Sequence, residues 1–147
     1  MDQFDDKILH ELRADGRITH TELGKRVGLS PSATMRRVQE LERTGVIAGY
    51  RAVINPQKIG NAFTAMIGVG LNDHSKAAQQ SFERSISASS AVVECHNVTG
   101  TIEYILRVEV PDLAAYKHFH TEILGSLPQV STLTTYAILS SPKDMRA

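Results

Sequence analysis

The hydrophobic periodicity of this sequence changes near residues 50–61. Before that segment, apolar residues recur at the three- and four-residue spacing of helices. After it, helical stretches alternate with stretches typical of strands. A chain of 147 residues is long enough for two small domains. We therefore expect a domain at 1–49, a β linker at 50–61, a second domain at 62–141 and a short tail at 142–147.

Three short helices are predicted in the first domain. The first covers FDDKILHELRADGR, where apolar residues recur at helical spacing, and stops at Gly16. The second begins with the capping-box pattern THTE at 19–22 and ends at Gly28, which can adopt the left-handed conformation. The third begins at Ser30, a preferred N-cap that is followed by a first-turn proline.

The third helix is predicted to bury one side and expose a basic one. Met35, Val38 and Leu41 recur on the side expected to be buried, and Arg36 projects roughly opposite. The whole chain is neutral, but residues 25–51 contain six Lys or Arg against two Glu, a local charge of +4. This concentration favours contact with phosphate in that segment.

Two helices joined by a glycine-containing turn have the layout of a DNA-binding helix-turn-helix. The free N–H groups at a helix N-terminus attract phosphate, and arginine can form paired hydrogen bonds with guanine. A solvated basic face on any three-helix unit has the same spacing, so this alternative stays open at this point. The candidate DNA-binding residues are Lys25, Arg26, Ser30, Ser32, Ala33, Thr34, Arg36, Arg37 and Arg43.

The second domain is predicted to have the element order βαββαβ. This order is the ferredoxin-like split βαβ arrangement, so the chain as a whole belongs to the α+β class. The predicted strands cover 62–71, 91–98, 103–110 and 130–139, and the predicted helices cover 75–86 and 112–124. Neither face of the first strand carries a charged residue. A second subunit, or a neighbouring part of the same domain, is expected to cover its open face.

The sequence resembles the Lrp/AsnC (feast/famine) family of transcription regulators over nearly all of residues 2–140. The resemblance rests on TELGKRVGLSPSATMRRVQELERTGVIAGYRAVINP and on VVECHNVTGTIEYILRVEVPDLAAYKHF. It implies an N-terminal helix-turn-helix that binds double-stranded DNA and a ferredoxin-like regulatory domain. It also implies a homodimer that forms through the sheet and often assembles further, commonly to an octamer. Effectors in this family are usually amino acids.

The resemblance places effector binding between subunits, near the loop at 98–104. This chain departs from the usual pattern, because Thr101 stands where many members have Asp and Leu133 stands where Thr is common. Glu103 is expected to pair with an ammonium group, and the alternative is a polar turn at a subunit contact. The candidate effector residues are Thr99, Gly100, Thr101, Glu103 and Thr135.

Other classes of protein find less support in the sequence. The six histidines lack metal-ligand spacing, and Cys95, the single cysteine, is expected to be a packed core residue. The apolar stretches fall short of the roughly 18 residues that a membrane span requires. We expect a cytoplasmic protein without a cofactor. Two alternatives remain: a siroheme-decarboxylase-like enzyme on the same two-domain fold, and an architectural protein that organises DNA.

Overall fold

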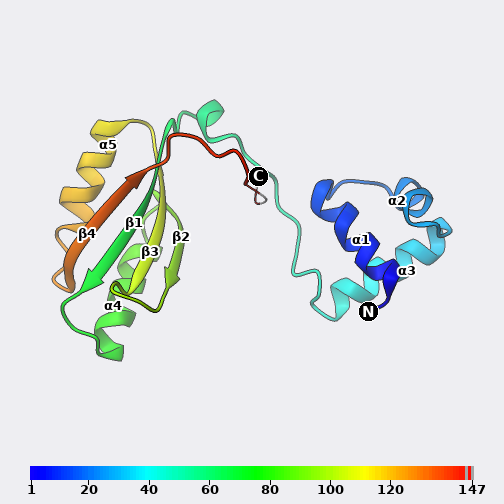
Figure 1. The fold of residues 1–147 in the computed structure, drawn as a ribbon, viewed down its shortest axis with the longest axis horizontal. Coiled ribbons are helices and arrows are strands. Elements are labelled where there is room, and N and C mark those ends of the chain that lie inside the picture. Colours follow the sequence, from blue (N-terminus) through cyan, green and yellow to red (C-terminus); the bar gives the residue numbers. More distant parts are fainter. Residues whose placement is uncertain (145, 147) are drawn as a thin grey trace. The chain divides into compact units, whose positions relative to one another are not determined.

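The computed structural model of the protein describes residues 1–144 and 146. Its residues separate into two compact units, Met1–Val53 and Ile54–Ala147. The first unit consists of helices and the second combines helices with a sheet (Figure 1). The boundary between the units falls inside the predicted linker.

Three helices make up the first unit, as predicted: α1 (Gln3–Ala14), α2 (His20–Val27) and α3 (Pro31–Arg43). Side-chain caps begin all three, with Asp2 preceding α1, Thr19 preceding α2 and Ser30 preceding α3. Only half of the predicted capping box at Thr19 forms. Its hydroxyl accepts from the backbone N–H of Glu22, but the Glu22 carboxylate binds Arg26 instead of the cap.

The turn between α2 and α3 is compact because Gly28 adopts φ 81°, in the left-handed region, and ends α2. The Ser30 hydroxyl then accepts from the N–H of Ala33 at 3.2 Å and starts α3. The helices enclose a small aliphatic core made of Ile8, Leu23, Val27, Val38 and Leu41.

Thr34 and Met35 on α3 correct the prediction. The side chain of Thr34 is fully buried, whereas Met35 is 42% exposed, so the expectations that Met35 lies in the core and that Thr34 contacts DNA are wrong. The cause is Gly24 on α2. A Cβ at Gly24 would lie 2.6 Å from the carbonyl oxygen of Leu29 and 3.0 Å from Oγ1 of Thr34. Because α2 approaches the turn so closely, a short side chain fits there.

The predicted β linker is not a strand in this structure. Residues 51–55 have no regular secondary structure, and a 3₁₀ turn, η1 (Pro56–Ile59), follows them. Asn55 caps that turn through its side-chain oxygen. Val53 and Ile54 are 61% and 57% exposed, so this segment lacks the side-chain packing that commonly stabilises a strand.

The second unit has the predicted ferredoxin-like order (Figure 1). Its elements are β1 (Phe63–Leu71), α4 (Lys76–Ser87), β2 (Val92–Asn97), β3 (Tyr104–Val110), α5 (Leu113–His118), η2 (Phe119–Leu124) and β4 (Val130–Ala137). The strands lie in the order β2-β3-β1-β4, and every neighbouring pair is antiparallel. The segment η2 continues α5 as one turn of π-helix.

The core of the second unit lies between one face of the sheet and its helices. Alternate residues of β1, such as Ile67 and Val69, are fully buried against Phe82 of α4 and Phe119 of η2. Cys95 was expected in this core and is exposed. It lies on β2, an edge strand of the sheet, so the helices cover it incompletely. Partial burial nevertheless raises the pKa of its thiol.

The opposite face of the sheet, called here the open face, carries the other residues of β1. Two glycines on it make room for neighbouring side chains. A Cβ at Gly68 would lie 2.8 Å from Cδ1 of Ile102, and a Cβ at Gly70 would overlap the side chain of Thr132. These glycines therefore allow other side chains to pack directly over the strand.

No helix among the described residues is both long and apolar enough to cross a membrane.

Gly24→Ala is expected to destabilise the first unit. The new methyl group would press on the backbone carbonyl of Leu29, which cannot move without opening the turn. Overpacking of this kind costs about 1–3 kcal/mol, more than the roughly 1 kcal/mol by which alanine favours a helix over glycine. The measurement is the Tm of the first unit by calorimetry on the full chain. Thr21→Ala, an exposed change on the same helix, is the control. A Tm that falls in neither variant would contradict the close approach.

Candidate DNA interface and effector loop

The exposed side of α3 carries a hollow that is open to solvent. Its lining consists of Arg36, Arg37, Gln39, Glu40 and Arg43. Arg36 is exposed and forms no ion pair with any described residue. Its guanidinium can therefore make new hydrogen bonds without first breaking an ion pair. This makes it the best placed of the predicted arginines to reach a base edge.

Arg37 has a different role from its neighbour. Its Nη1 lies 2.9 Å from Oδ2 of Asp2 and 2.9 Å from Oδ1 of Asp5, and its guanidinium carbon lies 5.3 Å from the centre of the Phe4 ring. The hydrogen bonds to Asp5 and Asp2 raise the pKa of Arg37. This arginine therefore ties α3 to the beginning of α1, and only 29% of its side chain is exposed. Arg37, predicted as a DNA-binding residue, is therefore already paired within the first unit.

Two further arginines predicted at the interface also have acidic partners. Arg26 bonds to Glu11 at 2.8 Å and Glu22 at 3.3 Å, and Arg43 forms two bonds with Glu40 at 2.7 and 2.8 Å. These hydrogen bonds raise the pKa of each arginine. Both guanidinium groups are exposed, and exposed pairs contribute little to stability. Phosphate can therefore replace the acidic partners at small cost.

The start of α3 presents short polar groups. Ser32 is exposed next to Ser30, with the two hydroxyl oxygens 3.3 Å apart, and Ala33 is half-buried. Lys25, in the last turn of α2, is also exposed. Short side chains at a helix N-terminus let its free N–H groups approach a phosphate closely.

Gln39 is a candidate that the sequence analysis missed. It is exposed and lines the same hollow as Arg36. A glutamine amide can form paired hydrogen bonds with adenine. The signal was available in the sequence, because residues three apart on a helix are neighbours on its surface.

The predicted effector loop is fastened to the end of β1 through Glu103. The N–H of Glu103 donates to the carbonyl of Val69 at 3.1 Å, and its own carbonyl accepts from the N–H of Val98 and the amide of Asn97. Its carboxylate accepts from the N–H of Leu71 at 2.6 Å. Between these fixed points, the loop exposes three of the predicted residues: Thr99, Gly100 and Thr101.

Thr135 lies apart from that loop within one chain. It pairs with Ile67 in the register of β4 with β1, and its hydroxyl forms a hydrogen bond with Tyr116 on the helix-covered face. Glu103 directly precedes β3, and β1 lies between β3 and β4. The structure of a single chain therefore does not bring the five predicted effector residues together.

Two family models match this chain. The AsnC-type helix-turn-helix domain matches residues 1–42, and the Lrp/AsnC ligand binding domain matches residues 64–147. The chain belongs to the Lrp/AsnC family of transcription regulators. The first matched range contains the Arg36 hollow apart from Arg43, and the second contains the loop of Glu103. The resemblance noted from the sequence is confirmed, as is the fold that it implies.

Known relatives of this Lrp/AsnC regulator agree over almost its full length. The leucine-responsive regulatory proteins of Escherichia coli (strain K12) and Salmonella typhimurium (strain LT2) are each 38% identical to it over 143 residues, which is 97% of this chain and 87% of the relative. A transcriptional regulator of Neisseria meningitidis, solved as a complex with L-Met, is 33% identical with a TM-score of 0.93. That match covers 98% of this chain and 93% of the other. An AsnC family regulator of Agrobacterium tumefaciens is 31% identical with a TM-score of 0.90, covering 98% and 94%.

These comparisons settle the class of protein. The Lrp/AsnC regulator has a DNA-binding domain followed by a domain for a small-molecule ligand. The enzyme alternative is not supported, because the matched models and relatives are transcription regulators. Within residues 1–144 and 146, the structure contains no group of three or more His, Cys, Asp and Glu side chains that could hold a metal ion.

Arg37→Ala is expected to lower the Tm of the first unit more than Arg36→Ala does. The first change removes the ion pairs with Asp2 and Asp5 and the contact with Phe4, whereas the second removes no ion pair with a described residue. Thermal unfolding of both variants, followed by circular dichroism, tests this. Adding Asp5→Asn to Arg37→Ala is expected to lower the Tm by less than the sum of the two single changes. Equal Tm values for the two arginine variants would contradict the structural role of Arg37.

Proposed function

We propose that this protein is a sequence-specific DNA-binding regulator in which α3 enters the major groove and Arg36 contacts a base. The observation that carries the proposal is the exposed guanidinium of Arg36, which forms no ion pair with any described residue and lies beside Gln39 on one side of a capped helix. Lys25, Arg26 and Arg43 supply contacts to the phosphate backbone. Ser30, Ser32 and Ala33 let the start of α3 approach that backbone.

The protein acts as a homodimer or a higher assembly, up to an octamer. A dimer presents two copies of α3 to successive major grooves, about 34–36 Å apart along the DNA. Its place of action is the cytosol, where bacterial and archaeal DNA is located. A regulator of this kind differs from an architectural protein by occupying a short, defined site. A footprint that lengthens continuously with protein concentration would support the architectural alternative.

The open face of the sheet is the surface proposed to join two copies. Tyr136 of β4 is 63% exposed on it, opposite Met66 in the strand register. At Gly68 and Gly70 the side chains of Ile102 and Thr132 pack over the strand. A second copy would bring its own sheet against these side chains, and sheets pack face to face about 10 Å apart.

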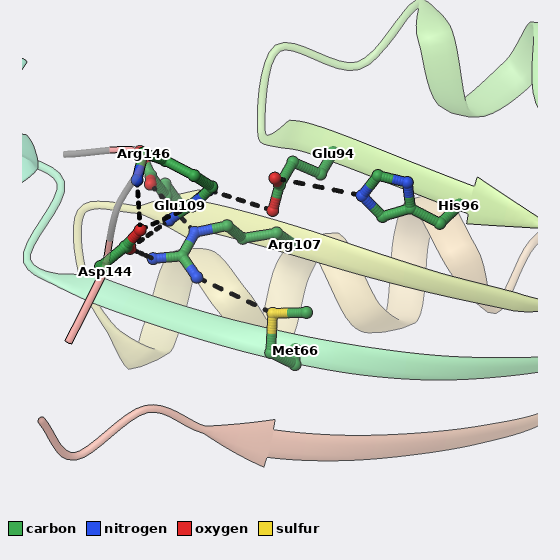
Figure 2. A network of polar contacts seen from close by, with 7 residues as sticks. All are labelled: Met66, Glu94, His96, Arg107, Glu109, Asp144 and Arg146. Atoms are coloured by element: carbon green, nitrogen blue, oxygen red, sulfur yellow. Dashed lines mark hydrogen bonds and ion pairs between the residues drawn. The ribbon is translucent and has the colours of Figure 1, made fainter. Parts of the chain in front are cut away.

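A charged cluster occupies another part of the open face, around Arg107 (Figure 2). Nε of Arg107 lies 3.5 Å from Glu109, and Nη2 lies 3.7 Å from Asp144 in the tail. Arg146 bonds to Asp144 and lies 3.0 Å from Glu94 on β2. Hydrogen bonds from Arg146 lower the pKa of Asp144 to about 2. Each of the two arginines and three carboxylates has an oppositely charged partner, so the cluster can lie beside an interface without leaving a charge unpaired.

An amino acid is the proposed effector, bound near the loop at 98–104. The relative solved with L-Met supports this choice of ligand class. Glu103 would receive the ammonium group, and Thr99, Gly100 and Thr101 would contribute polar groups from the loop. Thr135 takes part only if it comes from a second copy, because it lies apart from the loop within one chain. Binding between copies lets the effector shift assembly through unequal affinity for the two states.

Arg36→Ala is expected to weaken specific DNA binding by roughly tenfold or more, because one paired contact to a base contributes about 1–3 kcal/mol of discrimination. The measurement is fluorescence anisotropy with the protein's own promoter region and a scrambled duplex, at several salt concentrations. Arg13→Ala, an exposed arginine on α1, is the control. Loss of preference for the promoter duplex supports base reading, whereas equal affinity of Arg36→Ala and the wild type for the promoter would contradict it.

Tyr136→Glu is expected to shift the protein toward smaller assemblies, because a carboxylate would be buried without a partner between two sheets. Light scattering coupled to size-exclusion chromatography measures the mass. Leu113→Glu is a matched control, since Leu113 is 66% exposed but begins α5 on the helix-covered side of the sheet. If Leu113→Glu alone reduced the mass, the open face would not be the interface.

A further inference from the structure

The carboxylate of Glu103 has a backbone donor at the end of β1 and an imidazole partner from the segment that joins β1 to α4. Oε2 accepts from the backbone N–H of Leu71 at 2.6 Å, and Oε1 lies 2.8 Å from Nε2 of His74. The Glu103 side chain is only 20% exposed. The two oxygens therefore have separate partners, one from the main chain and one from a side chain.

The two partners, the N–H of Leu71 and the imidazole of His74, differ in how easily a ligand can replace them. The N–H of Leu71 belongs to the backbone at the end of β1, and Leu71 is only 4% exposed. The side chain of His74 is 70% exposed. Because the imidazole is largely exposed, its contact with Oε1 contributes little to stability, so a ligand group of the same chemistry can displace it. A ligand can therefore replace the partner of Oε1, whereas the partner of Oε2 stays in place.

We propose that His74 is an internal competitor for the ammonium group of the amino-acid effector at Oε1 of Glu103. The inference rests on the proposed function of the effector loop and adds a residue to it. An ammonium group and an imidazole N–H are both donors that fit a carboxylate oxygen at about 2.8 Å. When the ammonium binds, His74 turns away into solvent, and the bond from Leu71 keeps the carboxylate in place.

The hydrogen bonds that hold the surrounding loop do not use the imidazole of His74. Asp73 accepts from the N–H of Ser75 at 2.8 Å, and hydrogen bonding with Ser75 lowers the pKa of the Asp73 carboxyl. The hydroxyl of Ser75 in turn caps α4 by accepting from Ala78 at 3.2 Å. None of these bonds involves the imidazole. His74→Ala therefore removes the competitor without removing any of these hydrogen bonds of the loop.

The closing experiment measures binding of L-methionine, with L-leucine in parallel, by calorimetry on the full-length protein. His74→Ala is expected to bind the amino acid up to about fivefold more tightly, as loss of a weak surface competitor predicts. His74→Gln keeps an N–H donor and is expected to lie between His74→Ala and the wild type. Lys76→Ala, which removes a nearby exposed positive charge, controls for general electrostatics. Glu103→Gln is expected to lose at least tenfold in affinity.

A second readout follows the imidazole by NMR. Adding L-methionine to the wild type is expected to move the His74 ring resonances to the positions that they have in Glu103→Gln, because both changes free the ring. Unchanged or weaker affinity in His74→Ala, or ring resonances that stay in place on binding, would overturn the inference while the effector role of the loop stands. Failure of the wild type to bind either amino acid would contradict the proposed effector and this inference together.

Discussion

The close approach of α2 to the start of α3 determines which residues of α3 are exposed to solvent. Gly24 has no side chain, and a Cβ there would lie 2.6 Å from the carbonyl oxygen of Leu29 and 3.0 Å from Oγ1 of Thr34. The side of α3 that carries Thr34 therefore faces α2. With Thr34 turned inward, Met35 becomes exposed, and Arg36 and Gln39 line the solvent-open hollow. The surface proposed to contact DNA therefore depends on a packing constraint in a different helix.

Two adjacent arginines serve different purposes because of the acidic residues at the beginning of the chain. Asp2 caps α1 and also pairs with Arg37, as does Asp5, so the same carboxylates stabilise a helix end and hold α3. Arg36 lies one position, or about 100°, further around the helix and does not share these partners. The first unit thus uses Arg37 for packing and leaves Arg36 exposed for the proposed contact with DNA.

Much of the fold was predictable, because local signals agree with it. Gly28, Ser30 and the following proline end one helix and begin the next, and the period of the apolar residues distinguishes strands from helices in the second unit. The errors concern contacts between distant residues. Neither the pairing of Arg37 with Asp2 nor the fit of Thr34 against Gly24 has a local signature. The same holds for Thr135, whose partner Tyr116 lies on α5. By contrast, the three-residue spacing between Arg36 and Gln39 could have predicted that Gln39 lies beside Arg36.

The exposure of Arg36 and the confinement of Arg37 form the central claim, and arginine side-chain NMR tests it most directly. The Nε–Hε resonances of both residues can be followed while a duplex containing the promoter site is added. The account predicts a large shift for Arg36, together with the side-chain amide of Gln39, and little change for Arg37. A shift confined to Arg37, with Arg36 unaffected, would contradict it.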